Sequence, residues 1–277
     1  MPIRTIFGMA EDCARGGRQG WTEFVRDFGG IARNLVSHYF PSFAPELEGH
    51  VVAVLRQAGA QDGAWFTGLS FTNEREFMMA FRDLLFAYGR KQERLASQRS
   101  HPDGASELLI TLEQLRPIMQ DLMLLERELL WLFIKGYDAA HVAAIMMNAV
   151  ATAEAVQRAA AERSRALLPG ASPEVLTRSA PVLMETAEHS KTDACVSLKT
   201  FNNLVNGQIS WREREAAEGH TNNCFYCIDR FTTFKEMVRL RKDTPPLPLE
   251  QVEAILAQLP LADGRPRGVF SRLFAGQ

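Results

Sequence analysis

The sequence feature that most limits how this chain folds is a cluster of metal-type ligands in its last third. The segment GHTNNCFYC contains His220, Cys224 and Cys227, and Cys195 is separated from the histidine by 24 residues. A Cys-x2-Cys turn brings two thiolates to one Zn²⁺, and a histidine separated from the first cysteine by three residues reaches the same ion from the preceding helix. We therefore predict that Cys195, His220, Cys224 and Cys227 bind Zn²⁺, with His189 as a reserve first ligand.

The ligand set favours a structural metal over a catalytic one. Three cysteines and one histidine close a tetrahedral coordination sphere, whereas catalytic zinc keeps one position open. No His-Glu-x-x-His pattern accompanies the cluster. We expect a protein that is not an enzyme, with no catalytic residues and no small-molecule substrate, in which zinc contributes folding free energy to residues 193–242. The alternative is two unrelated buried thiols and a surface histidine.

The residues around the ligands predict short helices on either side of the metal. Asn206-Gly207 is a turn sequence, and Ser210 followed by Glu213 forms a capping box at the start of the next helix. A further helix is expected over 228–242. Its apolar stripe consists of Phe231, Phe234 and Val238, with Lys235, Arg239 and Lys242 around it. Such a stripe docks on a partner or on the earlier part of the same chain.

The first hundred residues also have helical periodicity. Apolar residues recur at helical spacing over 21–40, 45–59 and 73–99. Gly29-Gly30 is expected to bend or break the first of these helices, and Asn73 to cap the third. Between the second and third helices we expect a loop that is rich in aromatic residues, namely Trp65, Phe66 and Phe71.

The middle of the chain has the layout of a helix-turn-helix. A helix with Leu122, Leu125, Leu129 and Leu132 inward is expected to end at Gly136. Asp138 then caps a short helix that buries Val142, Ile145 and Met146, and Thr152 caps the final helix with Glu154 in its first turn. Two helices joined by a short turn favour a DNA-binding unit. The alternative is a three-helix bundle with no DNA role.

Breaker-rich segments at 97–106, 168–175 and after 243 divide the chain. We expect an all-α protein with domains at 1–100, 106–170 and 185–243 and a tail at 244–277. Within the tail, the segment RPRGVFSRLFAGQ is expected to be a short docking segment.

The charge balance argues against strong, autonomous binding to nucleic acid. Lys/Arg and Asp/Glu number 12 and 12 in residues 1–105, 6 and 8 in 106–172, and 13 and 13 in 173–277. No section has the basic excess that phosphate contacts require. No apolar run approaches the ~20 residues that span a bilayer. The N-terminus has no signal-peptide pattern. We expect a cytoplasmic protein that does not engage a membrane.

The zinc segment resembles the zinc-binding anti-sigma domain. The matching residues are Gly207, Ser210, Glu213-Arg214, His220, Cys224 and Cys227, over about 40 residues of LVNGQISWREREAAEGHTNNCFYC and its surroundings. Asn206 stands where the family usually has Asp, and Gly219 separates Glu218 from His220. The resemblance implies a domain that docks on a sigma factor.

The two upstream sections resemble the two domains of an extracytoplasmic-function sigma factor. GWTEFVRDFGGIARNLVSHYF is similar to the first sigma-2 helix, and residues 122–168 are similar to the sigma-4 helix-turn-helix. The resemblance implies core RNA polymerase and promoter DNA as partners. The implied DNA contacts are Thr152, Glu154, Gln157, Arg158 and Arg165 in sigma-4, and Trp65, Phe66, Arg90, Lys91 and Arg94 in sigma-2. The aromatic residues would stack on an unpaired base.

Two departures from the family bear on function. LEGHVVAVL replaces the usual acidic polymerase-binding signature, and TAEAVQRAAAERSRAL has few cations for a helix that reads DNA. The favoured hypothesis is a sigma-like transcription regulator that carries its own zinc-binding inhibitor and responds to metal or redox state. The alternative is an interaction scaffold that retains the sigma fold and structural zinc without promoter recognition.

Overall fold

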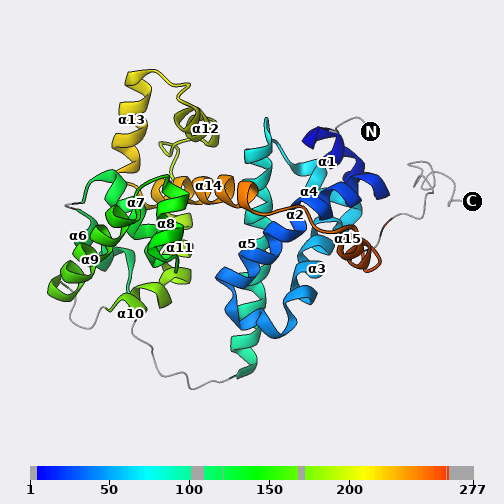
Figure 1. Ribbon diagram of the computed structural model, residues 1–277, viewed down its shortest axis with the longest axis horizontal. Helices are drawn as coiled ribbons and strands as arrows, with labels where there is room; N and C mark the ends of the chain where they lie inside the picture. Colours follow the sequence, from blue (N-terminus) through cyan, green and yellow to red (C-terminus); the bar gives the residue numbers. More distant parts are fainter. Residues whose placement is uncertain (1–4, 101–108, 121, 168–171, 260, 262–277) are drawn as a thin grey trace, which may run out of the picture. The chain divides into compact units, whose positions relative to one another are not determined.

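The computed structural model describes residues 5–100, 109–120, 122–167, 172–259 and 261, and the elements in these ranges are helices with no strand among them (Figure 1). The expected all-α class is confirmed. The chain divides into two compact units, one formed by 1–100 with 241–277 and the other by 101–240. The second unit therefore contains the predicted helix-turn-helix section together with most of the predicted zinc section.

The helices of the first unit precede and follow those of the second in the sequence. They are α1 (Ile6–Ala14), α2 (Arg18–Tyr39), a 3₁₀ helix (Pro41–Glu46), α3 (Leu47–Ala58), α4 (Ala60–Gly68), α5 (Glu74–Ser100) and α15 (Leu249–Leu256). The second unit contains α6 (Leu112–Gln120), α7 (Leu124–Ile134), α8 (Ala139–Met146), α9 (Val150–Leu167), α10 (Pro173–Arg178), α11 (Ala180–His189), α12 (Leu198–Asn206), α13 (Trp211–Thr221) and α14 (Phe225–Asp243). The last three residues of α14 belong to the first unit.

The core of the first unit is aromatic. The Phe24 ring of α2 lies 5.3 Å from those of Phe66 and Phe81 and 6.1 Å from that of Phe77, measured between centroids. Trp65 is half-buried beside the same cluster, at 6.5 Å from Phe24. The expected loop placement of Trp65 and Phe66 is wrong. Both residues lie in α4, and their rings pack against the aromatic core.

The glycine pair in α2 does not break the helix, contrary to expectation. Helix α2 continues through Gly29 and Gly30, and both residues are buried. A Cβ atom at Gly29 would lie 2.6 Å from Leu247 Cδ1, and one at Gly30 would lie 2.8 Å from Thr244 Cγ2. Because the two glycines have no side chain, Thr244 and Leu247 of the segment that follows α14 can pack directly against the α2 backbone.

This C-terminal segment is an integral part of the first unit. The Leu247 amide donates to the Arg26 carbonyl oxygen at 2.8 Å, and Asn34 Nδ2 donates to Thr244 Oγ1 at 3.0 Å. Helix α15 then runs beside α2 (Figure 1). Its buried face consists of Val252, Ile255 and Leu256. The helix was not expected from the sequence. The RPRGVFSRLFAGQ segment lies outside the described residues.

Helices α7, α8 and α9 share one apolar core in the second unit. Its buried members are Leu129, Leu132, Phe133, Val142, Ala143, Ile145, Met146, Ala153 and Val156. The expected inward positions Leu129 and Leu132 are confirmed. Leu125 is 41% exposed, contrary to expectation, and the buried Leu122 precedes α7. Helix α7 begins only at Leu124, so Leu125 lies in its first turn, and the buried face of the helix begins after that residue.

The residues at the helix ends set where α7 stops and where α8 and α9 begin. Gly136 follows α7 with a φ of +92°, and Asp138 caps α8 by accepting from the His141 amide, both as expected. Thr152 is not an N-cap, because α9 already begins at Val150. Glu154 is therefore beyond the first turn. The direction of the chain changes by 119° between α8 and α9 across residues 147–149. This angle and turn length are those of a helix-turn-helix.

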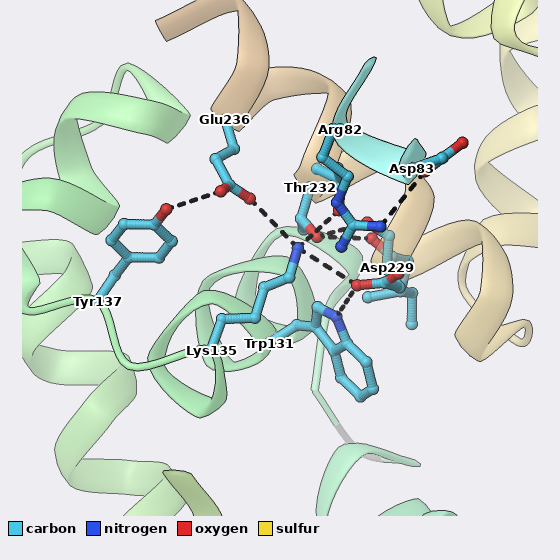
Figure 2. Close-up of polar contacts among 10 residues, drawn as sticks. Arg82, Asp83, Trp131, Lys135, Tyr137, Asp229, Thr232 and Glu236 are labelled. Atoms are coloured by element: carbon cyan, nitrogen blue, oxygen red, sulfur yellow. Dashed lines mark hydrogen bonds and ion pairs between the residues drawn. The ribbon is translucent and has the colours of Figure 1, made fainter. Parts of the chain in front are cut away.

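Buried charges join α7 to α14 within the second unit (Figure 2). The Lys135 side chain is fully buried, with its Nζ 3.2 Å from Asp229 Oδ1 and 3.4 Å from Glu236 Oε2. The Trp131 indole donates to Asp229 at 2.9 Å, and the Tyr137 hydroxyl donates to Glu236 at 2.7 Å. Each buried charge thus has an opposite charge and hydrogen bonds, as burial requires.

A second ion pair fixes the middle of α14. Lys235 Nζ lies 2.8 Å from Glu128 Oε2 of α7 and 4.3 Å from the Phe231 ring centroid. Phe234 on the same helix is fully buried. Lys235, which borders the predicted α14 stripe, is therefore engaged inside the second unit.

No single helix in the described part of the chain has the length and apolar composition to cross a bilayer. Helix α8 and residues 150–163 of α9 meet those criteria only as a pair, and the pair is bent by 119°.

Candidate metal centre

The four predicted zinc ligands come together in the second unit. One ligand atom from each of Cys195, His220, Cys224 and Cys227 lies within 4.8 Å of the other three. The Cys195 and Cys224 sulfurs are 3.8 Å apart. Two thiolates that share a tetrahedral Zn²⁺ at 2.3 Å each are separated by about the same 3.8 Å. The group is therefore compact enough to hold one metal ion.

A short turn positions Cys195 between α11 and α12. The Cys195 amide donates to the Thr192 carbonyl oxygen at 3.1 Å, and the Thr192 amide returns a hydrogen bond of 3.2 Å to Cys195 Sγ. Ser197 then caps α12 by accepting from the Thr200 amide. The thiol is thus held by backbone that is fixed at both ends.

Helix boundaries position the other three ligands. His220 lies in the last turn of α13, which begins at the predicted capping box of Ser210 and Glu213. Cys224 directly precedes α14, and Cys227 lies in the first turn of that helix. The predicted turn at Asn206-Gly207 is also present, with Gly207 at a φ of +67°.

Hydrogen bonds and burial shift the thiol pKa values in opposite directions. Burial is the largest single effect and raises the pKa of Cys195, but hydrogen bonds with the Thr192 amide and hydroxyl, His220 and Cys224 together lower this pKa to about 7. Burial raises the pKa of both Cys224 and Cys227 above the usual range. A bound metal must displace the protons of these thiols, so metal affinity increases with pH.

His220 supplies an independent test of whether a metal fits. Its Nε2 atom is buried and has no hydrogen-bond partner. A buried ring nitrogen without a partner is rare in native structures, and metal coordination satisfies it. By contrast, the reserve ligand His189 is exposed, its Nδ1 lies 2.7 Å from the Glu185 carbonyl oxygen, and it is outside the cluster. The residues therefore fit a metal ion, and three thiolates with an imidazole suit zinc.

The residues expected to contact DNA from the sigma-4-like section lie on α9. Thr152, Glu154, Gln157 and Arg158 are exposed. Arg165 lies in the same helix, but its side chain is outside the described part. The four exposed side chains have one positive and one negative charge among them, which provides little attraction for phosphate.

The residues expected to contact DNA from the first section lie on α4 and α5. Phe66 is only 4% exposed, and Trp65 is half-buried in the aromatic core. Arg90 lies 5.8 Å from the Phe86 ring centroid, whereas Lys91 and Arg94 are exposed on α5. Buried rings are core anchors, so Phe66 has little exposed area with which to stack on an unpaired base.

Sequence reasoning missed the buried charges Lys135, Asp229 and Glu236. Lys135 follows α7 directly, where a lysine usually stabilises the last helical turn from the surface. Asp229 and Glu236 are spaced by seven residues along α14, which places them on one face of the helix. That spacing is the signal that identifies the pair.

No family model, no curated protein and no solved structure matches the chain. The likeness to sigma and anti-sigma proteins therefore depends on the motif residues alone.

Proposed function

We propose that the chain is a sigma-like transcription regulator whose zinc-binding segment inhibits it in cis. Its partners would be core RNA polymerase and promoter DNA, in the cytoplasm. One observation carries the proposal. The metal-type cluster and the helix-turn-helix of α8 and α9 belong to one compact unit, and α14, which begins at the metal ligands, is anchored to α7 through Lys135.

Anchoring of α14 gives a physical basis for inhibition. Lys235 of α14 pairs with Glu128 of α7 and lies 3.8 Å from Met146 Sδ of α8. Because the inhibitory segment is covalently attached, its effective concentration at the helix-turn-helix is high, and a modest interface is enough to keep it bound. Loss of zinc or oxidation of the thiolates would loosen the start of α14 and release it.

The test is a co-purification of the full chain with bacterial core RNA polymerase. A truncation at residue 172 is unsuitable, because it would remove the α14 partners of Trp131 and Lys135 and expose that core. The full chain is instead compared as zinc-loaded wild type, chelator-treated wild type, His220→Ala and His189→Ala. His189→Ala is the matched control, because this histidine is exposed and outside the cluster.

We expect one zinc per chain in wild type and His189→Ala, and less in His220→Ala. Polymerase affinity should increase by at least about tenfold on chelation, equivalent to about 1.4 kcal/mol. It should fall back to the zinc-loaded value when zinc is restored. Restoration by zinc distinguishes release from irreversible unfolding. Equal polymerase binding with and without zinc would contradict inhibition in cis.

One observation favours an interaction scaffold as the second candidate. Met147 is 87% exposed and Val150 is 45% exposed at the turn before α9, where a DNA-reading unit needs polar contacts. Exposed apolar side chains at such a turn suit a protein partner. If the chain binds polymerase neither when loaded with zinc nor after chelation, although the wild type purifies with one zinc, the scaffold function replaces the sigma-like one.

A further inference from the structure

A groove of about 470 Å³ lies in the first unit, where α1 packs beside α4 (Figure 1). This volume is within the range of binding pockets. Its walls come from one face of α1, the last turn of α4 and the segment that leads into α5. Six of its nine lining residues are apolar, namely Phe7, Ala10, Ala14, Phe66, Leu69 and Phe71.

Stacked aromatic rings lead from the core to the open side of this groove. The Phe7 ring lies parallel to the Phe71 ring, with 4.9 Å between centroids, and Phe71 meets the buried Phe77 at 5.3 Å. Phe7 is nevertheless 44% exposed. Phe71 covers one face of the Phe7 ring, so the exposed area can receive another apolar or cationic group. An open ring beside an apolar groove is typical of a surface that a further segment covers.

The rim of the groove is negatively charged. Among the described lining residues Glu11 alone carries a charge, and its side chain is 71% exposed. Its carboxylate lies 3.9 Å from Arg15 Nη2, which is too long for a hydrogen bond. An exposed carboxylate beside an apolar groove favours an occupant that combines large apolar side chains with positive charge.

A segment of this chain has the same combination. The sequence RPRGVFSRLFAGQ, residues 265–277, lies outside the described residues. Its large apolar side chains are those of Phe270, Leu273 and Phe274, at the i, i+3, i+4 spacing by which segments fill apolar grooves. It also contains three arginines and no acidic residue. The segment therefore complements the groove in both apolar character and charge.

The 265–277 segment is attached within reach of the groove. The chain leaves α15 beside α3, where the Gln258 carbonyl oxygen accepts from Arg56 Nη2 at 2.9 Å. Helix α4 begins two residues after α3 ends, and its nine residues span about 14 Å towards the groove. The step from Leu261 to Phe270 can extend over about 30 Å. The tether is thus long enough for the apolar residues to enter the groove.

We propose that the 265–277 segment docks in this groove of its own chain. Phe270, Leu273 and Phe274 pack against Phe7 and the other apolar lining residues, and the arginines of the segment face Glu11. A short tether gives the segment an effective concentration of about millimolar, so a weak interface is enough to keep it bound. While it is bound, no other apolar segment can enter, and the segment therefore controls access to this face of the first unit.

A competition experiment tests the docking. A labelled peptide with the sequence of residues 262–277 is titrated with the zinc-loaded full chain, and fluorescence anisotropy reports binding. The wild type is compared with Phe270→Ser/Phe274→Ser, whose own segment has lost its large rings. Both substitutions lie outside the described residues and alter no described contact. We expect saturable binding to the double variant and at least about tenfold weaker binding to wild type, because the attached segment competes with the peptide.

Substitutions in the groove, made in the double variant, locate the site. Phe7→Ser should weaken peptide binding by about tenfold or more. Leu249→Ser, which removes an exposed apolar side chain from α15 of the same unit, should leave it unchanged. Glu11→Lys should weaken binding by about threefold, and Glu46→Lys, at an exposed position outside the lining, is its matched control. Glu11→Lys keeps the Phe7 ring in place, so its effect does not depend on loss of folding.

Three results would overturn the docking. They are a peptide that binds neither chain, a peptide that binds both equally, and groove variants that both bind as tightly as their controls. The weaker binding to wild type should also be independent of protein concentration. A dependence on concentration would place the segment of a second copy in the groove and would overturn docking within one chain.

Discussion

The two compact units are stabilised by different kinds of interaction. In the first, rings such as Phe24, Phe77 and Phe81 fill the interior, and backbone packs closely against side chains at Gly29 and Gly30. Apolar burial is non-directional and scales with area. This interior therefore gains most of its stability from the amount of apolar surface that it buries.

The second unit buries a network of opposite charges, whereas the buried charge of the first unit in the described residues is the single guanidinium of Arg82. Lys135 and Glu236 are almost wholly removed from solvent, and Asp229 is 11% exposed. A network of this kind tolerates little displacement, because each ion depends on its partners for the solvation it has lost. The metal cluster has the same property, since a tetrahedral site needs all four ligands. The difference predicts that single changes are more damaging in the second unit than in the first.

The largest effect is expected from Lys135→Met. The substitution leaves two buried carboxylates without this cation, and breaking a buried pair in this way costs about 3–5 kcal/mol. Hydrogen exchange of the α7 amides at increasing denaturant concentration measures the change in the second unit, whereas tryptophan fluorescence would mix Trp131 with Trp21 and Trp65 of the first unit. The matched control is Lys199→Met, because Lys199 is exposed on α12.

A compensated variant separates charge from packing. Lys135→Met combined with Asp229→Asn and Glu236→Gln removes the charges together, and stability should recover in large part. If Lys135→Met is as stable as Lys199→Met, the network does not stabilise the unit, and the comparison between the two units fails.

A smaller effect is expected from Gly30→Val in the first unit. The added side chain would meet Thr244 Cγ2, and overpacking of this kind costs about 1–3 kcal/mol. Because the strain falls on the C-terminal segment, the Leu247 amide, which is bonded to the Arg26 carbonyl oxygen, should exchange its hydrogen faster. Gly49→Val in α3 is the control, since a Cβ there meets nothing within 4 Å.

Hydrogen-exchange mass spectrometry of the full chain compares the two glycine variants. Equal exchange of the Leu247 amide in the two variants would mean that the C-terminal segment does not pack against Gly29 and Gly30.

The sequence predicted local features better than long-range ones. The capping box at Ser210 and the glycine at position 207 depend on a few neighbouring residues, and both are present. The metal ligands were predictable for a similar reason, because the Cys-x2-Cys spacing itself defines a turn. Thr152 misled the assignment of α9, because a good capping residue can also occupy a helix interior.

Features that join distant segments were not predictable. The role of Gly29 and Gly30 depends on Leu247, more than 200 residues later in the sequence. The burial of Phe66 likewise depends on α2. A short aromatic run that contains a glycine is predicted as a loop when the side chains that pack against it are unknown. Local patterns constrain φ and ψ, whereas tertiary partners decide which surface is buried.

The smallest effect is expected at the Asp138 cap of α8, and it has a defined pH dependence. The carboxylate accepts from the His141 amide at 2.8 Å, and this backbone hydrogen bond is the main reason that the pKa of Asp138 is lowered. The unfolded chain therefore binds the proton more tightly than the folded one. The stabilisation is complete above the unfolded pKa of about 3.9 and is lost as the pH falls through the lower native pKa.

Asp138→Ala and Asp138→Asn separate the cap from its charge. At pH 7, Asp138→Ala should destabilise the second unit by about 1 kcal/mol, and Asp138→Asn should cost less because the amide oxygen still accepts from His141. Below the native pKa, wild type and Asp138→Asn should converge, because a protonated carboxyl and an amide are similar acceptors. A pH-independent difference between them would show that the ionised cap contributes nothing, whereas convergence at low pH assigns the effect to the Asp138 charge.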